Sequence, residues 1–175
     1  NENINADNLV ILDASMKPVT SVGRDISQDQ PVCIKGARRF DFDNEIRDKS
    51  TDLPHMMPSA DFFTEEMQKL GIDHDSAIVV YDTVGVYSSP RAWWMFRAMG
   101  HDQVAVLDGG LPAWKDAGFP CGTEAATSAK VRGNFVSHPQ DGAFVDSKQV
   151  LAVLNNSKYA VIDARSEGRF HGTEP

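Results

Sequence analysis

The chain has 175 residues, of which 41% are apolar and 24% are charged, and its formal net charge is −8. This length and composition suit a water-soluble protein with one packed domain, or with one domain and a fragment of another. We expect neither nucleic acid nor a membrane as a partner, because the chain is acidic and has no apolar run near the roughly 18 residues of a membrane-spanning helix.

The cysteines and the first residues bear on the cellular compartment. Cys33 and Cys121 lie far apart without a pairing motif, which favours a reducing environment. The N-terminal residues show no basic stretch followed by an apolar one, so they do not read as a secretory signal. We therefore expect a cytoplasmic protein, and a periplasmic location stays open if a signal has been removed.

The first third of the chain begins with a buried strand. Residues 9–14 are too uniformly apolar for a strand with one face in water. Residues 34–40 predict a second short strand after a bend at Gly36. The acidic stretch 41–52 contains few apolar residues and indicates a solvated surface loop.

The central part alternates helices with strands. Ser59 is a suitable N-cap, and Ser89 followed by Pro90 is a second good helix start. Glycines close each helix. The predicted elements are helices over 59–70, 89–99 and 111–117 and strands over 77–81 and 104–107. This alternation predicts an α/β fold, with a parallel sheet flanked by helices on both faces.

The last third contains an internal echo of the first. Residues 120–142 lack periodicity and read as a linker, which is followed by a predicted helix over 147–154 and a strand over 159–163. Ile11-Leu12-Asp13-Ala14 recurs as Val161-Ile162-Asp163-Ala164, at an offset of 150 residues, which suggests a tandem duplication. We expect a first domain over 1–122, a linker over 123–143 and the start of a second domain over 144–175.

The loop after the strand 77–81 is the first place to look for chemistry. A strand that leads through a tight loop into a helix N-terminus is where α/β proteins bind anions and place nucleophiles. The loop reads Asp82-Thr83-Val84-Gly85-Val86-Tyr87-Ser88, without cysteine, lysine or histidine. Asp82 lacks the second aspartate of a phosphatase at position 84, and the loop matches neither a P-loop nor a nucleophile elbow. Asp82 is therefore interpreted as a cap for the loop amides, with a catalytic role as the minority alternative.

Other candidate residues carry weaker signals. Both cysteines lack the electropositive context of a nucleophile and are interpreted as structural. The five histidines form no metal-ligand spacing, so no metal is expected. His55 lies in a proline-rich turn, where a surface histidine is favoured and an acid/base pair with Asp43 is the alternative. Arg165 and Arg169 are either anion contacts or ordinary solvated arginines, with equal weight.

Six motifs occur in an order that is typical of one protein family. They are residues 10–14 (Val-Ile-Leu-Asp-Ala), 34–43 (Ile-Lys-Gly-Ala-Arg-Arg-Phe-Asp-Phe-Asp), 53–58 (Leu-Pro-His-Met-Met-Pro), 89–97 (Ser-Pro-Arg-Ala-Trp-Trp-Met-Phe-Arg), 107–114 (Leu-Asp-Gly-Gly-Leu-Pro-Ala-Trp) and 161–175, with its Asp-Ala-Arg-Ser, Gly-Arg-Phe and Gly-Thr-Glu-Pro. On these motifs nearly the whole chain resembles the N-terminal rhodanese domain, and the first part of the C-terminal domain, of the two-domain thiosulfate/3-mercaptopyruvate sulfurtransferases. One departure is Cys33-Ile34-Lys35, where the family usually has His-Ile-Pro.

The resemblance implies roles that the residues alone do not establish. In the family, a cysteine of the C-terminal domain opens a Cys-x-x-Gly-x-x-Ser/Ala loop and carries sulfane sulfur as a persulfide. Here Asp82, Gly85 and Ser88 keep that spacing with aspartate in the cysteine's place, which implies a degenerate, non-catalytic loop. Asp43 and His55 match residues that lean across the domain interface as supporting catalytic groups, in a proton-handling arrangement.

The resemblance also implies a donor site and a reaction. Arg169 matches an arginine that holds the donor's carboxylate or sulfonate, and its usual second arginine would follow Pro175. The implied function is transfer of sulfur from 3-mercaptopyruvate or thiosulfate to a thiol or cyanide acceptor, without a cofactor, together with a missing C-terminal domain. The chain by itself should then be inactive. The alternative is a non-enzymatic rhodanese-like module for binding or regulation.

Overall fold

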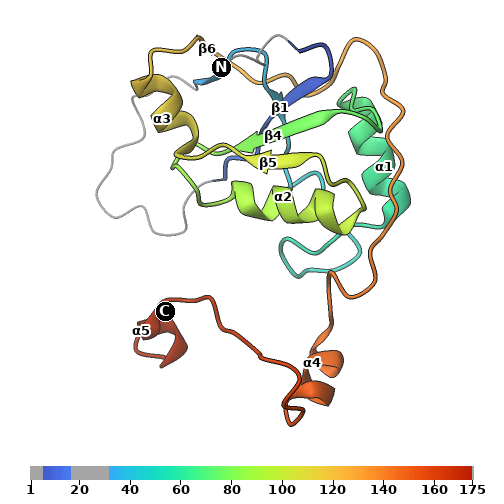
Figure 1. Ribbon diagram of the computed structural model, residues 1–175, viewed down its shortest axis with the longest axis vertical. Helices are drawn as coiled ribbons and strands as arrows, with labels where there is room; N and C mark the ends of the chain where they lie inside the picture. Colours follow the sequence, from blue (N-terminus) through green and yellow to red (C-terminus); the bar gives the residue numbers. More distant parts are fainter. Residues whose placement is uncertain (1–5, 17–31, 175) are drawn as a thin grey trace. The chain divides into compact units, whose positions relative to one another are not determined.

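The computed structural model describes residues 6–16 and 32–174 and divides the chain into two compact units, Asn1–Gln140 and Asp141–Pro175. Figure 1 shows the elements of each unit, which are described separately below. Within the described residues, no helix has both the length and the apolar character needed to cross a membrane.

The described residues of the first unit form a parallel sheet of four strands. The strand order is β3 (Arg38–Arg39), β1 (Leu9–Asp13), β4 (Ala77–Tyr81) and β5 (Val104–Val106), and every pair is parallel. The expected α/β fold with a parallel sheet is confirmed, although β3 occupies only two residues of the predicted 34–40 strand. A second, two-stranded antiparallel sheet joins β2 (Cys33–Ile34) to β6 (Cys121–Gly122), a long-range pairing that no local pattern announced.

One face of the sheet carries the main core. Side chains of β1 and β4 alternate, and Leu12 and Val80 point to the face that α1 (Ala60–Lys69) and α2 (Ser89–Ala98) cover. Aromatic rings fill the space between sheet and helices, at centroid distances of 5.3 to 6.2 Å and mostly edge-to-face. These rings belong to Phe40, Phe63, Phe96 and Phe135, all at most 1% exposed.

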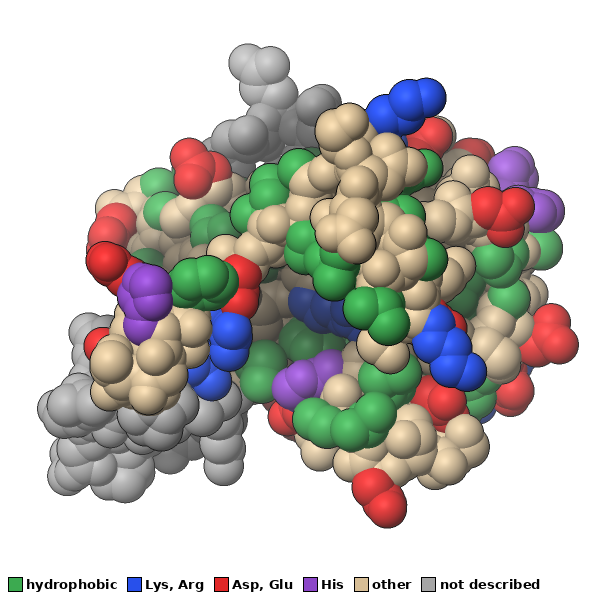
Figure 2. All heavy atoms as spheres, turned by 90° about the horizontal axis from the view of Figure 1, so that it is seen from below, with side chains coloured by type: hydrophobic (Ala, Val, Ile, Leu, Met, Phe, Trp, Pro, Cys, Tyr) green, Lys and Arg blue, Asp and Glu red, His purple; other side chains and the backbone are tan. Residues whose placement is uncertain are grey.

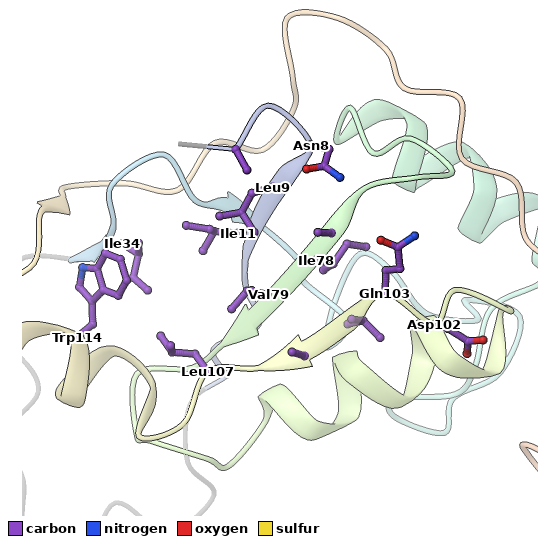
Figure 3. A pocket seen from close by; sticks show the side chains of 14 residues that line it. Asn8, Leu9, Ile11, Ile34, Ile78, Val79, Asp102, Gln103, Leu107 and Trp114 are labelled. Atoms are coloured by element: carbon purple, nitrogen blue, oxygen red, sulfur yellow. The ribbon is translucent and has the colours of Figure 1, made fainter. Parts of the chain in front are cut away.

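Among the described residues of the first unit, the opposite face is covered only in part. The helix α3 (Gly110–Asp116) packs Leu111 against Tyr81 and Ile34. Beyond α3 the sheet borders an open cavity of about 730 Å³. Figure 3 shows that apolar side chains of the strands and Trp114 of α3 line this cavity. The prediction of helices on both faces is thus correct, with one face only partly covered.

The carboxyl end of β1 is tied to β4 by a buried carboxylate. Asp13 is 7% exposed and accepts a hydrogen bond from the Tyr81 hydroxyl (3.1 Å) and one from the backbone N–H of Ser15 (2.9 Å). Arg39 lies 3.3 Å from the same carboxylate. The Tyr81 hydroxyl in turn accepts a bond from the Ile34 N–H, which joins the two sheets.

Part of the segment expected as a linker is bonded to the first unit. We call residues 126–140 the strap; it runs past α1 in Figure 1. Its backbone N–H groups donate to carbonyls of α1, of the turn after it and of the end of α2. The bonds run from Ala129 to Lys69, Gly133 to Gln68, Phe135 to Ile72, His138 to Met99 and Gln140 to Ala98, at 2.8 to 3.1 Å. The strap therefore completes the core of this unit, while the domain limits 1–122, 123–143 and 144–175 stay predictions.

Residues 141–174, the described part of the second unit, form two helices. The helix α4 (Ser147–Val153) begins with a capping box between Asp146 and Gln149, and α5 (Glu167–Phe170) is a single turn. The predicted strand over 159–163 is wrong, since these residues form no ladder and Ile162 is 84% exposed. A strand needs the backbone hydrogen bonds of a neighbour, and no strand lies among the described residues 141–174.

A buried histidine beneath the strap predicts a pH dependence of stability. His101 is 6% exposed, and its Nε2 lies 2.9 Å from the Ser76 carbonyl oxygen. Its ring contacts Phe135 of the strap at 5.6 Å. Burial lowers the pKa of His101, so the folded state favours the neutral ring. This contribution to stability is complete above the unfolded pKa of about 6.5 and declines as the pH falls toward the lowered folded pKa.

We expect His101→Gln to unfold with about 1–2 kcal/mol less free energy than the parent at pH 8, because packing and a hydrogen bond are lost. The variant should lose less stability than the parent between pH 7 and pH 5. Urea unfolding at several pH values measures both effects, with the exposed His74→Gln as control. Parallel pH profiles of parent and His101→Gln would contradict the assignment.

Candidate functional site

The side chain of Asp82 lies at the carboxyl end of β4, between the sheet and the start of α2, and it is fully buried. Its Oδ1 accepts hydrogen bonds from the N–H groups of Val84 (2.9 Å) and Gly85 (3.0 Å). Its Oδ2 accepts from the N–H groups of Tyr87 (2.8 Å), Ser88 (3.0 Å) and Ser89 (3.0 Å) and from the Ser89 hydroxyl (2.7 Å). We call these six donors the Asp82 cradle.

The cradle holds Asp82 as an anion. Burial raises the pKa of this carboxyl, but hydrogen bonds from Ser89, Tyr87 and Val84 outweigh it, and the pKa is lowered. The donors include the first amides of α2, which have no partners within the helix and carry the positive end of its dipole. The interpretation of Asp82 as a cap of loop amides is confirmed.

The prediction that the Ser89 side chain caps α2 is wrong. The helix begins at Ser89, and the N-cap residue is Ser88, whose side chain makes no capping bond. Asp82, seven residues before the helix starts, takes the capping role instead. A carboxylate from the preceding loop has replaced the serine cap, because a carboxylate accepts several amide bonds where a hydroxyl accepts one or two.

Two glycines after β5 let a second turn approach the loop. Gly109 and Gly110 have φ angles of 70° and 54°. A Cβ at position 110 would lie 2.5 Å from the carbonyl oxygens of Asp82 and Gly85. The N–H of Leu111 donates to the Asp82 carbonyl at 3.0 Å. The Asp-Gly-Gly motif therefore supports the loop 82–88 through main-chain contacts.

Asp43 and His55 form a second polar feature. His55 Nε2 lies 2.6 Å from Asp43 Oδ1, and both side chains are a little over one third exposed. The loop around Asp43 is anchored by the buried side chains of Phe42 and Ile46, so the solvated loop expected over 41–52 has buried anchors. Phe42 also packs edge-on against the His55 ring at 5.7 Å.

His55 is held by an arginine that sequence reasoning did not single out. Arg91 donates from Nη2 to the His55 carbonyl oxygen at 2.6 Å. Desolvation lowers the pKa of Arg91. His55 has a left-handed backbone, with φ of 59°, and is the only non-glycine residue of the described chain with a positive φ. The sequence did contain a signal for this contact: Arg91 is a cation in the first turn of a helix. The helix dipole disfavours a positive charge there, which points to a partner elsewhere in the fold.

The loop 83–88, the helix α2 and the turn 53–57 together present exposed hydrophobic side chains. They are Leu53, Met56, Val84, Val86, Tyr87 and Trp94, at 39% to 60% exposure. Figure 2 views the molecule from below and shows hydrophobic side chains exposed among acidic, basic and polar ones. We call these six side chains the exposed hydrophobic patch; large exposed apolar side chains of this kind are typical of a surface that another protein segment covers.

The remaining candidates are the two cysteines and the two arginines of the second unit. Cys33 is buried, and burial raises the pKa of its thiol, which agrees with a structural role; Cys121 is exposed and unpaired. Arg165 is occupied by Asp163, with Nη2 to Oδ2 at 2.6 Å, and this bond lowers the pKa of Asp163 to about 2. Arg169 belongs to α5 in the second unit. Across residues 6–16 and 32–174, no group of three acidic, histidine or cysteine side chains could hold a metal ion.

The cradle predicts a large stability cost for a conservative change at position 82. In Asp82→Asn the amide NH₂ would face N–H donors and leave several of them unpaired, so the free energy of unfolding should fall by about 3 kcal/mol at pH 7. Because the folded-state pKa is lowered, the parent should lose this advantage as the pH falls from about 4 through that pKa. Urea unfolding from pH 7 to pH 3 measures both effects.

Asp108→Asn is the matched control, since Asp108 is exposed at the end of the neighbouring strand. Its effect should stay within about 0.5 kcal/mol. A loss below about 1 kcal/mol for Asp82→Asn at pH 7 would show that the six bonds contribute little.

The chain was compared with a protein family and with known proteins. Residues 1–117 match the rhodanese-like domain. The chain is 37% identical over 173 residues to the human 3-mercaptopyruvate sulfurtransferase, covering 95% of this chain and 56% of that protein. It is 37% identical over 169 residues to the Gallus gallus thiosulfate sulfurtransferase, with 95% of this chain and 57% of that protein covered.

Solved structures agree. The crystal structure of the Escherichia coli 3-mercaptopyruvate sulfotransferase SseA matches with a TM-score of 0.82 at 32% identity, over 97% of this chain and 64% of that one. The Saccharomyces cerevisiae Tum1 protein matches with a TM-score of 0.80 at 29% identity, over 99% of this chain and 60% of that one. The chain spans about half the length of the curated relatives it matches. With its parallel sheet, its strand-to-helix loop and a family match over 117 of 175 residues, the chain belongs to the rhodanese-like domain family.

Proposed function

We propose that this chain is the N-terminal half, and the start of the C-terminal half, of a tandem-domain sulfurtransferase. The observation that carries the proposal is the occupied Asp82 cradle. The loop lies where this fold can mount a nucleophile, but its side chain is a carboxylate held by six hydrogen bonds, which has no sulfur to give or take. The nucleophile then has to come from the second copy, whose equivalent loop falls near position 232.

The proposed reaction moves one sulfur atom through a cysteine persulfide on that second domain. With thiosulfate, the thiolate attacks the outer sulfur, the S–S bond of the donor breaks and sulfite leaves. With 3-mercaptopyruvate, the C–S bond breaks, the carbon takes the proton of the donor thiol, and pyruvate leaves. A thiol or cyanide acceptor then takes the sulfur, and no cofactor is involved.

Asp43 and His55 are proposed as supporting groups at the junction with the second domain. The pair is accessible, its geometry is fixed by Arg91 and Phe42, and it lies beside the exposed hydrophobic patch. A histidine that shares a short hydrogen bond with a carboxylate suits proton transfer. Only the mercaptopyruvate route moves a proton from sulfur to carbon, so the pair should matter most for that donor.

Arg169 is proposed to hold the donor's anionic group, since a guanidinium binds carboxylate or sulfonate with parallel hydrogen bonds. Arg169 lies on the single-turn helix α5, and its backbone N–H donates to the side chain of the N-cap residue Ser166. A cytoplasmic setting remains part of the proposal, and the similar Arabidopsis thaliana sulfurtransferase 1 is described as mitochondrial.

The chain as given should be inactive. We expect no thiocyanate from thiosulfate and cyanide, and no pyruvate from 3-mercaptopyruvate and a thiol, above the rate without protein. The full-length protein encoded by the same gene should turn over at least one donor under the same conditions. Turnover by the 175-residue chain would contradict the proposal.

In the full-length protein, His55→Asn should lower kcat/KM for 3-mercaptopyruvate by about 100-fold, the usual scale of a lost acid–base group, and Asp43→Asn should have a similar effect. Thiosulfate turnover should fall much less. The exposed His74→Gln variant is the control and should behave as the parent with both donors. Equal losses with both donors would indicate that the pair positions the domains rather than a proton.

The competing function is a non-enzymatic rhodanese-like module for binding or regulation, which the exposed hydrophobic patch would also suit. The same assays decide between the two. A full-length protein that is inert toward both donors, and that lacks a cysteine in the second loop, would favour the module.

A further inference from the structure

Arg91 lies in the first turn of α2, where a positive charge is unfavourable for two reasons. The amides of that turn carry the positive end of the helix dipole, which repels a cation. The guanidinium is also partly removed from water, and this desolvation lowers the pKa of Arg91. A residue that breaks local rules in this way is typical of a functional site, so its contacts carry information.

The Arg91 side chain contacts a turn that lies 36 residues earlier in the chain. Its Nη2 donates to the carbonyl oxygen of His55 at 2.6 Å. A charged donor makes a hydrogen bond about twice as strong as a neutral one, and partial burial strengthens it further. The backbone of His55 is left-handed, which is unfavourable for a residue with a Cβ. The N–H of Asp48 holds the neighbouring Met56 carbonyl at 3.0 Å, but the anchor on His55 itself comes from Arg91.

The contacts of the His55 ring leave one of its nitrogens available. Nε2 lies 2.6 Å from Asp43 Oδ1, and the ring packs edge-on against Phe42. Within the described part of the chain, no hydrogen bond reaches Nδ1. When the Nε2–H donates to the carboxylate, Nδ1 carries the lone pair that can accept a proton. A rotation of the turn would redirect Nδ1 and would break the short bond to Asp43.

We propose that Arg91 is a positioning residue for proton transfer by His55. Its bond to the His55 carbonyl ties the main chain of the turn to the start of α2, and this tie sets the direction in which Nδ1 faces. Arg91 thus acts through His55 and not on the donor.

The inference rests on the proposed function, because it concerns the proton that moves during turnover of 3-mercaptopyruvate. The thiolate of the second domain attacks the donor sulfur, and the C–S bond breaks with its electron pair left on carbon. The proton of that sulfur passes through Nδ1 of His55 to the carbon, which gives pyruvate and the persulfide anion. An Nδ1 that faces another way cannot relay this proton.

The 175-residue chain tests the geometry without turnover. Long-range ¹H–¹⁵N spectra at pH 8.5 report which ring nitrogen of a histidine carries the proton. We expect one tautomer of His55 in the parent, with the proton on Nε2, and a mixture of both tautomers in Arg91→Gln. Arg97→Gln is the matched control, since Arg97 lies in the last turn of the same helix, is exposed and pairs with Asp102 at 2.9 Å. A spectrum like that of the parent from a folded Arg91→Gln chain would overturn the proposal.

Turnover by the full-length protein tests the role. Arg91→Gln should lower kcat for 3-mercaptopyruvate by about 10- to 100-fold with little change in KM, because a misplacement of about 1 Å can cost about 100-fold. Thiosulfate turnover moves no proton from sulfur to carbon and should change little. Arg91→Lys keeps a charged donor and should recover part of the rate. In a His55→Asn background, Arg91→Gln should have no further effect, because the two residues act as one unit.

Equal losses with both donors, or additive losses from the changes at positions 55 and 91, would show a general structural role and overturn the proposal. Urea unfolding of each variant separates these outcomes from a loss of the fold. If Arg91→Gln does not fold, Arg91→Lys is used for the same comparisons. A full-length protein that is inert toward both donors would contradict the proposed function, whereas the tautomer spectra would still decide whether Arg91 orients the His55 ring.

Discussion

The hydrogen bonds between Asp82 and the start of α2 organise the functional end of this domain. They join the carboxyl end of the central strand β4 to the first turn of the helix, and through the main chain they also locate the Gly109–Gly110 turn. Without a buried anion, five amides and a hydroxyl would converge on an unfilled space, which is costly in a region removed from water. The loop 82–88 is therefore stable in this conformation when Asp82 is ionised.

The helix α2 also positions the Asp43–His55 pair. Arg91 lies in the first turn of α2, and its contact with the His55 carbonyl fixes the turn that presents the His–Asp pair. The first turn of α2 therefore contacts both features: Ser89 bonds Asp82, and Arg91 bonds the His55 carbonyl. A change in the cradle that shifted α2 would also shift His55, although the two carboxylates have separate partners.

Local patterns in the sequence predicted the parts of the fold that are locally determined. The helices around Phe63 and Phe96, the strands β1, β4 and β5 and the capping function of Asp82 followed from apolar spacing, caps and glycines. The β2–β6 pairing and the strap could not be predicted, because both depend on bonds between residues far apart in the chain. The strand over 159–163 failed for the related reason that β-propensity forms no ladder without a neighbour. At the site, the sequence favoured a surface histidine at 55. The contact with Asp43 depends on a left-handed residue and an arginine from another element, which composition does not reveal.

The left-handed backbone of His55 has a consequence for substitutions at this position. A non-glycine residue at φ of 59° costs about 1 kcal/mol relative to glycine, although histidine tolerates it better than most. Glycine at position 55 would relieve that cost and keep the carbonyl that Arg91 contacts. That substitution would also remove the contacts of the ring with Asp43 and Phe42, so any gain in stability would be smaller than the backbone cost alone.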